Sequence, residues 1–133
     1  MLKIISKLFP SKHEKDVKEI YPLVEEINKY YEEYKTLSDD QLRNKTVEFR
    51  NRIKENTDEI ETKLAEHKEK LKLDIDQKER IRISEEVETL EKDLFITIND
   101  TLDEILPEAF AVVKDTCRRL MGKEWLAAGS KVR

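Results

Sequence analysis

The sequence predicts an all-α protein, with a short amphipathic N-terminal helix and an elongated helical bundle that contains an antiparallel helical hairpin. The 133-residue chain has only two glycines and three prolines, which is few for the turns of an α/β enzyme. Charged residues make up 42% of the chain and apolar residues 38%, a profile typical of long solvated helices and coiled coils. High charge with few aromatic residues is also typical of disorder. However, the net charge is only −4 and apolar residues recur at helical spacing, which favours order.

The first predicted element is a short amphipathic helix over residues 1–10. Its apolar residues cluster on one side: Leu2, Ile4, Ile5, Leu8 and Phe9. Lys3 and Lys7 lie one turn apart on another side, and Pro10 ends the helix because the residue before a proline disfavours helical geometry. Two interpretations stay open. The apolar face beside two lysines suits an anionic membrane surface, or it packs on the following helices or on another chain.

A helical scaffold segment is predicted over residues 11–56, and its first helix runs from about Lys12 to Lys35. Its apolar stripe has intervals of three and four residues: Val17, Ile20, Tyr21, Val24, Ile27, Tyr31 and Tyr34. Pro22 interrupts this pattern. A proline is unfavourable inside a helix, so we expect either a kink there or a restart with Pro22 at the first helical position.

The second helix of this segment has a clear start signal. Ser38 and Gln41 fit a capping box, with Ser38 as the N-cap and Gln41 three residues later. Leu37 and Leu42 occupy the two positions of a hydrophobic staple around that cap. The helical pattern weakens near Asn56, where the scaffold segment is expected to end.

A charged helical hairpin is predicted over residues 57–98. Its first helix has a thin stripe of Ile60, Leu64, His67 and Leu71, and its return helix has Ile83, Val87, Leu90, Leu94 and Ile98. Asp74, Ile75 and Asp76 form the expected turn. Each helix has only a narrow apolar seam and needs a partner, so two antiparallel helices are the simplest arrangement.

Another scaffold helix is predicted over residues 99–122, with Asn99 or Asp100 as a possible cap. Its apolar stripe consists of Phe110, Val113, Cys117 and Leu120. Gly122 is well placed to stop the helix. Residues 123–133 show no recognisable pattern, and we interpret them as a truncated tail.

No catalytic, cofactor-binding or metal-binding residue is predicted. A phosphate-binding loop needs several glycines, and the chain has only Gly122 and Gly129. His13, His67 and Cys117 lack the spacing of a zinc site. The single cysteine cannot form an internal disulfide, and the acidic balance argues against a nucleic-acid partner. No apolar run approaches the ~20 residues of a membrane span, and no secretory cleavage site is present, so we expect an intracellular protein.

Three stretches together resemble the N-terminal region of the SecA family. They are the opening MLKIISKLFPSK, the segment LSDDQLRNKTVEFRNRI over Leu37–Ile53, and the segment LDEILPEAFAVVKDTCRRLMG over Leu102–Gly122. The second and third are long and occur in the same order as in the family. Residues 57–98 fall between the matching stretches, and we interpret them as a helical insertion whose role the resemblance does not give.

The resemblance implies that the parent protein is an ATP-driven motor for preprotein export, with ATP and Mg²⁺ as cofactors bound beyond Arg133. It implies a SecY-type channel complex, an anionic membrane surface, preprotein and a second SecA protomer as partners. The location implied is cytoplasmic and peripheral on the cytoplasmic face of the inner membrane. The expected membrane or channel contact residues are Leu2, Lys3, Ile4, Ile5, Lys7, Leu8 and Phe9.

The other two matching segments are expected to be scaffold helices without catalytic residues. They are expected to pack on the first motor domain, so in isolation they would leave that docking face bare. Residues 123–133 would then lead into the first motor domain. A different class of function also fits the sequence, namely a stand-alone helical protein-interaction module with a membrane-surface helix.

Overall fold

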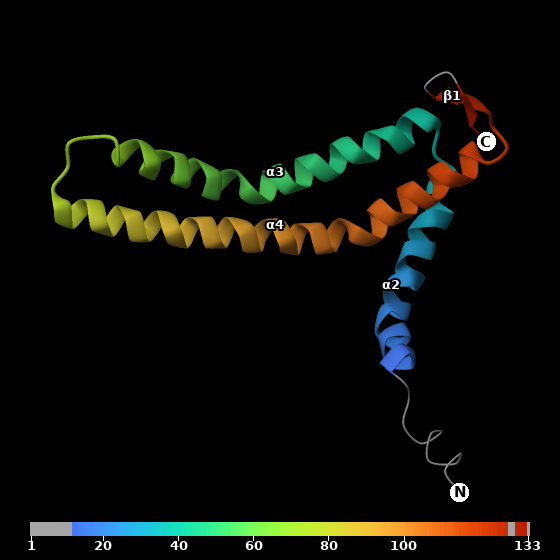
Figure 1. Ribbon diagram of the computed structural model, residues 1–133, viewed down its shortest axis with the longest axis horizontal. Coiled ribbons are helices and arrows are strands. Elements are labelled where there is room, and N and C mark those ends of the chain that lie inside the picture. Colours follow the sequence, from blue (N-terminus) through green and yellow to red (C-terminus); the bar gives the residue numbers. More distant parts are fainter. Residues whose placement is uncertain (1–11, 128–129, 133) are drawn as a thin grey trace, which may run out of the picture. The chain divides into compact units, whose positions relative to one another are not determined.

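The computed structural model describes the backbone of residues 12–127 and 130–132, and the side chains of residues 16–124. Its three helices are α2 (Lys12–Tyr34), α3 (Asp39–Lys70) and α4 (Gln77–Leu120), followed by the short strands β1 (Trp125–Ala127) and β2 (Ser130–Val132) (Figure 1). The predicted all-α class is therefore confirmed, with one small strand pair added. The predicted helix over residues 1–10 lies outside the described residues.

The chain divides into two compact units, which are described separately below. The terminal unit comprises residues 1–42 and 107–133, and so contains α2, the first turn of α3 and the last turns of α4. The hairpin unit comprises residues 43–106. Both unit boundaries lie inside helices, and so do the predicted segment ends at residues 56 and 98.

The start of α3 confirms the predicted capping box. The backbone N–H of Gln41 donates to the hydroxyl oxygen of Ser38 over 3.2 Å, and the backbone N–H of Ser38 donates to Oε1 of Gln41 over 2.8 Å. Leu42 is buried, and Leu37 packs against the same cluster as Leu42. Two backbone donors at the helix start are therefore satisfied by side chains, and the staple positions close the turn that follows α2.

The core of the terminal unit is small and is formed by α2, the start of α3 and the end of α4. Tyr34, Leu42 and Ala111 are its buried apolar members. Partly buried residues surround them: Ile27, Tyr30, Tyr31, Leu37 and Val112. The predicted stripe on α2 is thus half confirmed, because only its C-terminal members reach the core. Pro22 lies within a continuous α2, so of the two expected alternatives, a kink or a restart at Pro22, the restart does not occur.

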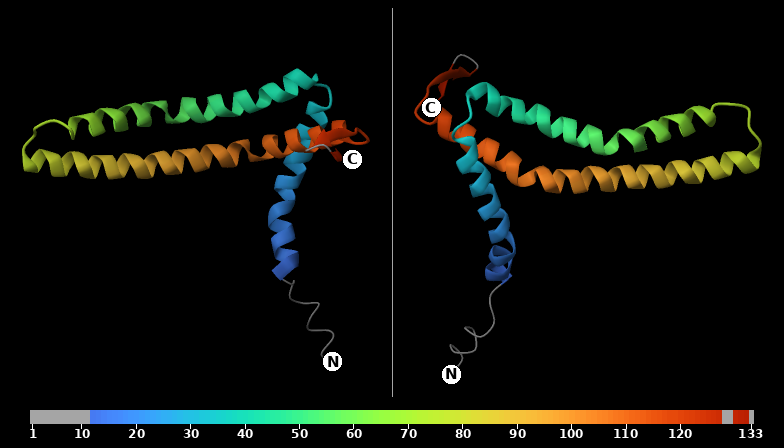
Figure 2. Two further views of the ribbon diagram at one scale, coloured as in Figure 1. Left: turned by 45° about the horizontal axis from the view of Figure 1, so that its top comes forward. Right: turned by 180° about the vertical axis from the view of Figure 1, so that it is seen from behind.

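The hairpin unit consists of two antiparallel helical arms, as predicted, and Figure 2 shows them side by side in two further views. Ile83 and Ile105 are buried, and most other seam residues are half-buried. The backbone N–H of Glu79 donates to Asp76 Oδ1 over 2.9 Å, so Asp76 caps the start of α4. The turn expected around Asp74–Asp76 is therefore present.

Two expected interruptions are absent from the hairpin unit. α3 continues past Asn56, and α4 continues past Asn99, so neither residue marks a helix end. The amide of Asn56 donates to the hydroxyl of Thr101 on the other arm over 3.0 Å, and the amide of Asn99 donates to the carbonyl of Phe95 one turn earlier over 2.8 Å. Both side chains thus find partners within the hairpin, where the sequence pattern indicated a cap or a fraying end.

α4 ends where the sequence predicts. Gly122 has φ 76°, the left-handed conformation that favours glycine after a helix. The backbone N–H of Lys123 donates to the carbonyl of Leu120 over 3.0 Å, which closes the last turn. Beyond it, β1 pairs antiparallel with β2, and Trp125 lies opposite Val132. The sequence showed no pattern over these residues, because strands of three residues are too short to display an alternation.

Candidate functional site

The end of α4 is fixed in the terminal unit by the side chain of Arg119. Its Nη2 donates to the carbonyls of Tyr34 and Leu37 over 3.1 and 2.6 Å, and its Nη1 donates to Asp39 Oδ1 over 2.6 Å. Its Nε donates to Asp115 Oδ2 over 2.7 Å. The planar guanidinium therefore satisfies carbonyls at the end of α2 and acidic side chains on α3 and α4 at the same time.

Asp115 is the acidic partner at the centre of this arrangement, and its side chain is fully buried. Arg118 Nε donates to its Oδ1 over 2.7 Å, while Arg119 occupies its Oδ2. Burial raises the pKa of Asp115, but the hydrogen bonds and charges of the two arginines outweigh this effect, so the pKa lies below its ordinary value. Asp115 is thus held as a carboxylate inside the unit.

A second buried polar contact lies one to two turns earlier on α4. The hydroxyl of Tyr34 donates to Glu108 Oε2 over 2.8 Å, and Glu108 is buried. Lys114 lies over the ring of Tyr31, 4.4 Å from its centroid, and donates to Asn28. The face of α4 that contacts α2 is therefore largely polar. Its hydrogen bonds form only when donor and acceptor are aligned, so they fix how the two helices are oriented.

The opposite face of α4 in the terminal unit carries a bare apolar stripe, made of Phe110, Val113, Cys117 and Leu120. Phe110 is 54% exposed, Val113 60% and Leu120 43%, and Cys117 is exposed as well. This is the stripe that the sequence marked as the helix's apolar face. It lies away from the unit's own core, because the core positions are held by Ala111, Asp115 and Glu108 instead. These four residues recur every three or four positions, so they share one exposed face of α4.

The N-terminal half of α2 is also bare on its apolar side. Val17, Ile20, Tyr21 and Val24 are exposed, although they continue the stripe whose later members pack in the core. The sequence of this half of α2, residues 12–24, carries three lysines and three acidic residues, so its charges are balanced.

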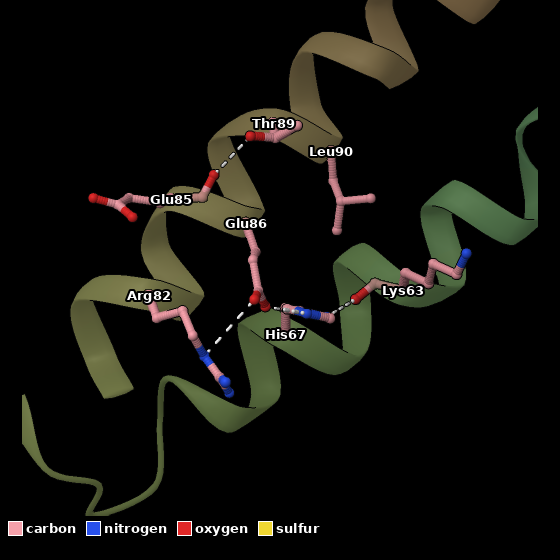
Figure 3. Close-up of a pocket in the computed structure, with 7 residues that line it drawn as sticks. All are labelled: Lys63, His67, Arg82, Glu85, Glu86, Thr89 and Leu90. Atoms are coloured by element: carbon pink, nitrogen blue, oxygen red, sulfur yellow. Dashed lines mark hydrogen bonds and ion pairs between the residues drawn. The ribbon is translucent and has the colours of Figure 1, made fainter. Parts of the chain in front are cut away.

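The hairpin unit carries a groove near its turn, between the ends of its two arms. Figure 3 shows the side chains that line it: Lys63, His67, Arg82, Glu85, Glu86, Thr89 and Leu90. His67 Nε2 lies 2.9 Å from Glu86 Oε2, and its Nδ1 lies 2.7 Å from the carbonyl oxygen of Lys63. The lining mixes both signs of charge.

Within the part of the chain that the structure describes, no group of three or more His, Cys, Asp or Glu side chains is placed to hold a metal ion. No helix of that part is long and apolar enough to cross a bilayer. The predicted membrane or channel contact residues, Leu2 to Phe9, lie outside the described residues, so the structure does not place them.

Sequence reasoning missed the polar side of the site. It singled out none of Glu108, Asp115 and Arg119, in a chain with 26 basic and 30 acidic residues. Their spacing of seven and four residues was the available signal, because it places them on one face of α4. That face of α4 packs against α2 and the start of α3.

Comparison with known proteins decides the family. Residues 5–127 match the family model described as the SecA DEAD-like domain. The chain belongs to the SecA family. The protein translocase subunit SecA of Chloroherpeton thalassium is 47% identical over 131 residues, which is 98% of this chain and 13% of the relative. The corresponding subunit of Chlorobaculum tepidum is 42% identical over 133 residues, and that of Porphyromonas gingivalis is 42% identical over 123.

The matches to the Chlorobaculum and Porphyromonas proteins cover 99% and 90% of this chain, and 13% and 11% of those relatives. The chain therefore spans about an eighth of the length of the SecA relatives it matches. The match to the Chloroherpeton protein covers nearly the whole chain, so it includes the hairpin segment 57–98. No solved structure matches the chain at a significant level.

Proposed function

We propose that this SecA chain is the N-terminal scaffold and contact segment of an ATP-driven protein-export motor, and that catalysis lies outside it. The observation that carries this proposal is the bare stripe of Phe110, Val113, Cys117 and Leu120 on α4. A helix whose polar face is locked in place while its apolar face stays exposed has a docking role. The occupant we propose is the first motor domain of the same protein.

The geometry of the terminal unit supports this role. Arg119 and Asp115 fix the rotation of α4, so the stripe points away from α2. Removing apolar surface from water contributes roughly 25 cal/mol per Å², from which the entropic cost of association is subtracted. A docked motor domain would therefore gain from the stripe without any rearrangement of the terminal unit.

The remaining parts of the proposal concern partners and cofactors. ATP and Mg²⁺ would be bound by the rest of the motor, beyond Arg133. Leu2 to Phe9 would contact an anionic membrane surface or a SecY-type channel complex, and the motor would act on preprotein, with a second SecA protomer as a further partner. The motor would be cytoplasmic and peripheral on the inner membrane.

The docking role is tested by mixing this chain with the separately produced remainder of the motor and measuring association by sedimentation. Replacing Phe110 and Val113 by Asp should weaken association at least tenfold. Phe95 and Ile96, which are also more than half exposed but lie on the hairpin unit, provide the control, and their double Asp variant should bind as the parent chain does. Equal binding by both variants would contradict the docking role. If the parent chain does not associate at all, the alternative of a stand-alone helical interaction module is favoured.

The membrane contact is tested by flotation with anionic liposomes at low salt. K3E/K7E should reduce the bound fraction, because each lysine near such a surface contributes on the order of 1 kcal/mol. The control is K72E/K92E, which changes the same number of charges at exposed positions of the hairpin unit. It should keep a larger bound fraction than K3E/K7E. Indistinguishable losses would remove the N-terminal segment as the membrane contact.

A further inference from the structure

The two arms of the hairpin unit are joined near their turn by the ring of His67. On one side Nδ1 faces the carbonyl oxygen of Lys63 at 2.7 Å, and on the other Nε2 faces Oε2 of Glu86 at 2.9 Å (Figure 3). Lys63 belongs to the same arm as His67, whereas Glu86 belongs to the opposite arm. One nitrogen therefore orients the ring, and the other makes the contact between arms.

Both neighbours of the ring can only accept a hydrogen bond. A backbone carbonyl oxygen has no hydrogen to give, and an ionised carboxylate has none either. A neutral imidazole carries one N–H and can satisfy only one of the two, whereas an imidazolium carries two. We propose that His67 in its doubly protonated form is a proton-dependent clasp between the two arms, and that loss of one proton loosens the end of the hairpin.

The charged groups around the ring support the clasp. On α4, Arg82 lies with its Nε 3.7 Å from the other oxygen of Glu86, and Glu85 lines the same groove. On α3, Lys63 lines the groove. Arginine, lysine and carboxylate side chains ordinarily keep their charge between about pH 5.5 and 8, and imidazole is the side chain that ordinarily changes charge there. Among the side chains that line the groove, His67 is the one whose ring presents either one or two N–H donors.

Other contacts near the turn do not depend on His67. Lys68 and Glu91 form an ion pair across the arms at 2.8 Å. Arg80 donates to the carbonyls of Leu71 and Leu73 over 2.8 and 3.2 Å. These contacts hold the turn when the clasp opens, so we expect local loosening and not unfolding of the unit. The direction follows from the chemistry: the clasp is closed at the acidic end of the range and opens as the pH rises.

The test uses the full 133-residue chain with His13 replaced by Gln, so that His67 is the only histidine. Amide hydrogen exchange of residues 63–86 is measured from about pH 5.5 to 8 and corrected for the intrinsic effect of pH. Protection should fall with rising pH, on the order of fivefold. That is a modest value for a hydrogen bond to a charged group at a partly exposed site.

Three variants separate the clasp from general electrostatics. H67Q should show no dependence on pH, with protection near the parent's value at the alkaline end. E86Q should also lose the dependence, because a glutamine amide can donate to a neutral ring nitrogen as readily as its oxygen can accept. E91Q breaks the neighbouring ion pair and should keep the dependence. Constant protection in the parent, or a dependence that persists in H67Q or E86Q, would overturn the proposal.

Discussion

Arg119 of α4 and Asp39 at the start of α3 are in contact, with 2.6 Å between Nη1 and Oδ1, although 80 residues separate them in the sequence. The same guanidinium reaches the carbonyls of Tyr34 and Leu37. It thus holds the end of α2, the start of α3 and the end of α4 together. The short connection between α2 and α3 is therefore fixed from outside by a side chain of α4.

This arrangement predicts that R119K destabilises the terminal unit although it keeps the charge. A lysine ammonium is a single point charge, so it cannot reproduce the fork that serves two carbonyls and two carboxylates at once. We expect the thermal unfolding midpoint, followed by circular dichroism, to fall by several degrees.

R118K is the matched control, because Arg118 also bonds Asp115 but lies on the more exposed side. Its effect should be clearly smaller. A midpoint for R118K as low as that of R119K would mean that the contacts of Arg119 to α2 and α3 contribute nothing.

The buried carboxylate of Asp115 should make the stability of the fold depend on pH in the acidic range. Burial raises the pKa of Asp115, but hydrogen bonds from Arg118 and Arg119 lower it by more than burial raises it. The pKa in the folded state therefore lies below the ordinary 3.8. A group of this kind stabilises the fold above its unfolded pKa, and this contribution is lost as the pH falls through its folded pKa. We expect D115N to unfold more easily near neutral pH and to lose less stability than the parent chain below about pH 4.

The control for this prediction is E59Q. The pKa of Glu59 is also lowered, by its hydrogen bond and ion pair with Lys63, but the pair is exposed and contributes little. E59Q should therefore follow the acid response of the parent chain. Chemical denaturation at several pH values measures both variants, and an unchanged acid response in D115N would exclude Asp115 as its source.

Local signals in the sequence predicted those parts of the fold that depend on interactions between neighbouring residues. The capping box of Ser38 and Gln41 and the stop at Gly122 depend on residues within one turn, so the sequence contains all of their partners. The continuity of α3 and α4 could not be predicted in this way. Asn56 bonds Thr101, which lies 45 residues away, so a local pattern does not contain this partner.

The packing of α4 was less predictable, because two faces of the helix compete. The apolar stripe of Phe110 and Val113 is the stronger sequence signal, yet the polar face with Asp115 packs in the terminal unit. A buried carboxylate is stable only when its partners are in place, and here they come in part from α4 itself. Hydrophobic periodicity alone cannot distinguish a core face from a docking face.

The capping box makes a prediction about stability. S38A removes the hydroxyl that accepts from the N–H of Gln41, so the start of α3 loses one satisfied donor. We expect the free energy of unfolding to fall by about 1 kcal/mol, the usual cost of removing an N-cap. Ser84 is the comparison, because its hydroxyl donates to the carbonyl of Arg80 inside a helix. S84A should change stability by less than about 0.5 kcal/mol, and a cost equal to that of S38A would argue against the cap.

The two faces of α4 predict opposite responses to the same added bulk. Ala111 is 0% exposed and lies in the cluster with Tyr34 and Leu42, whereas Val113 is 60% exposed on the bare stripe. A111L forces extra methylene groups into a packed core and should cost about 1–3 kcal/mol. V113L adds one methylene to an exposed position and should change the free energy of unfolding by less than about 0.5 kcal/mol. Urea unfolding of both variants measures the difference, and equal costs would show that the stripe is packed within this chain and is not available for docking.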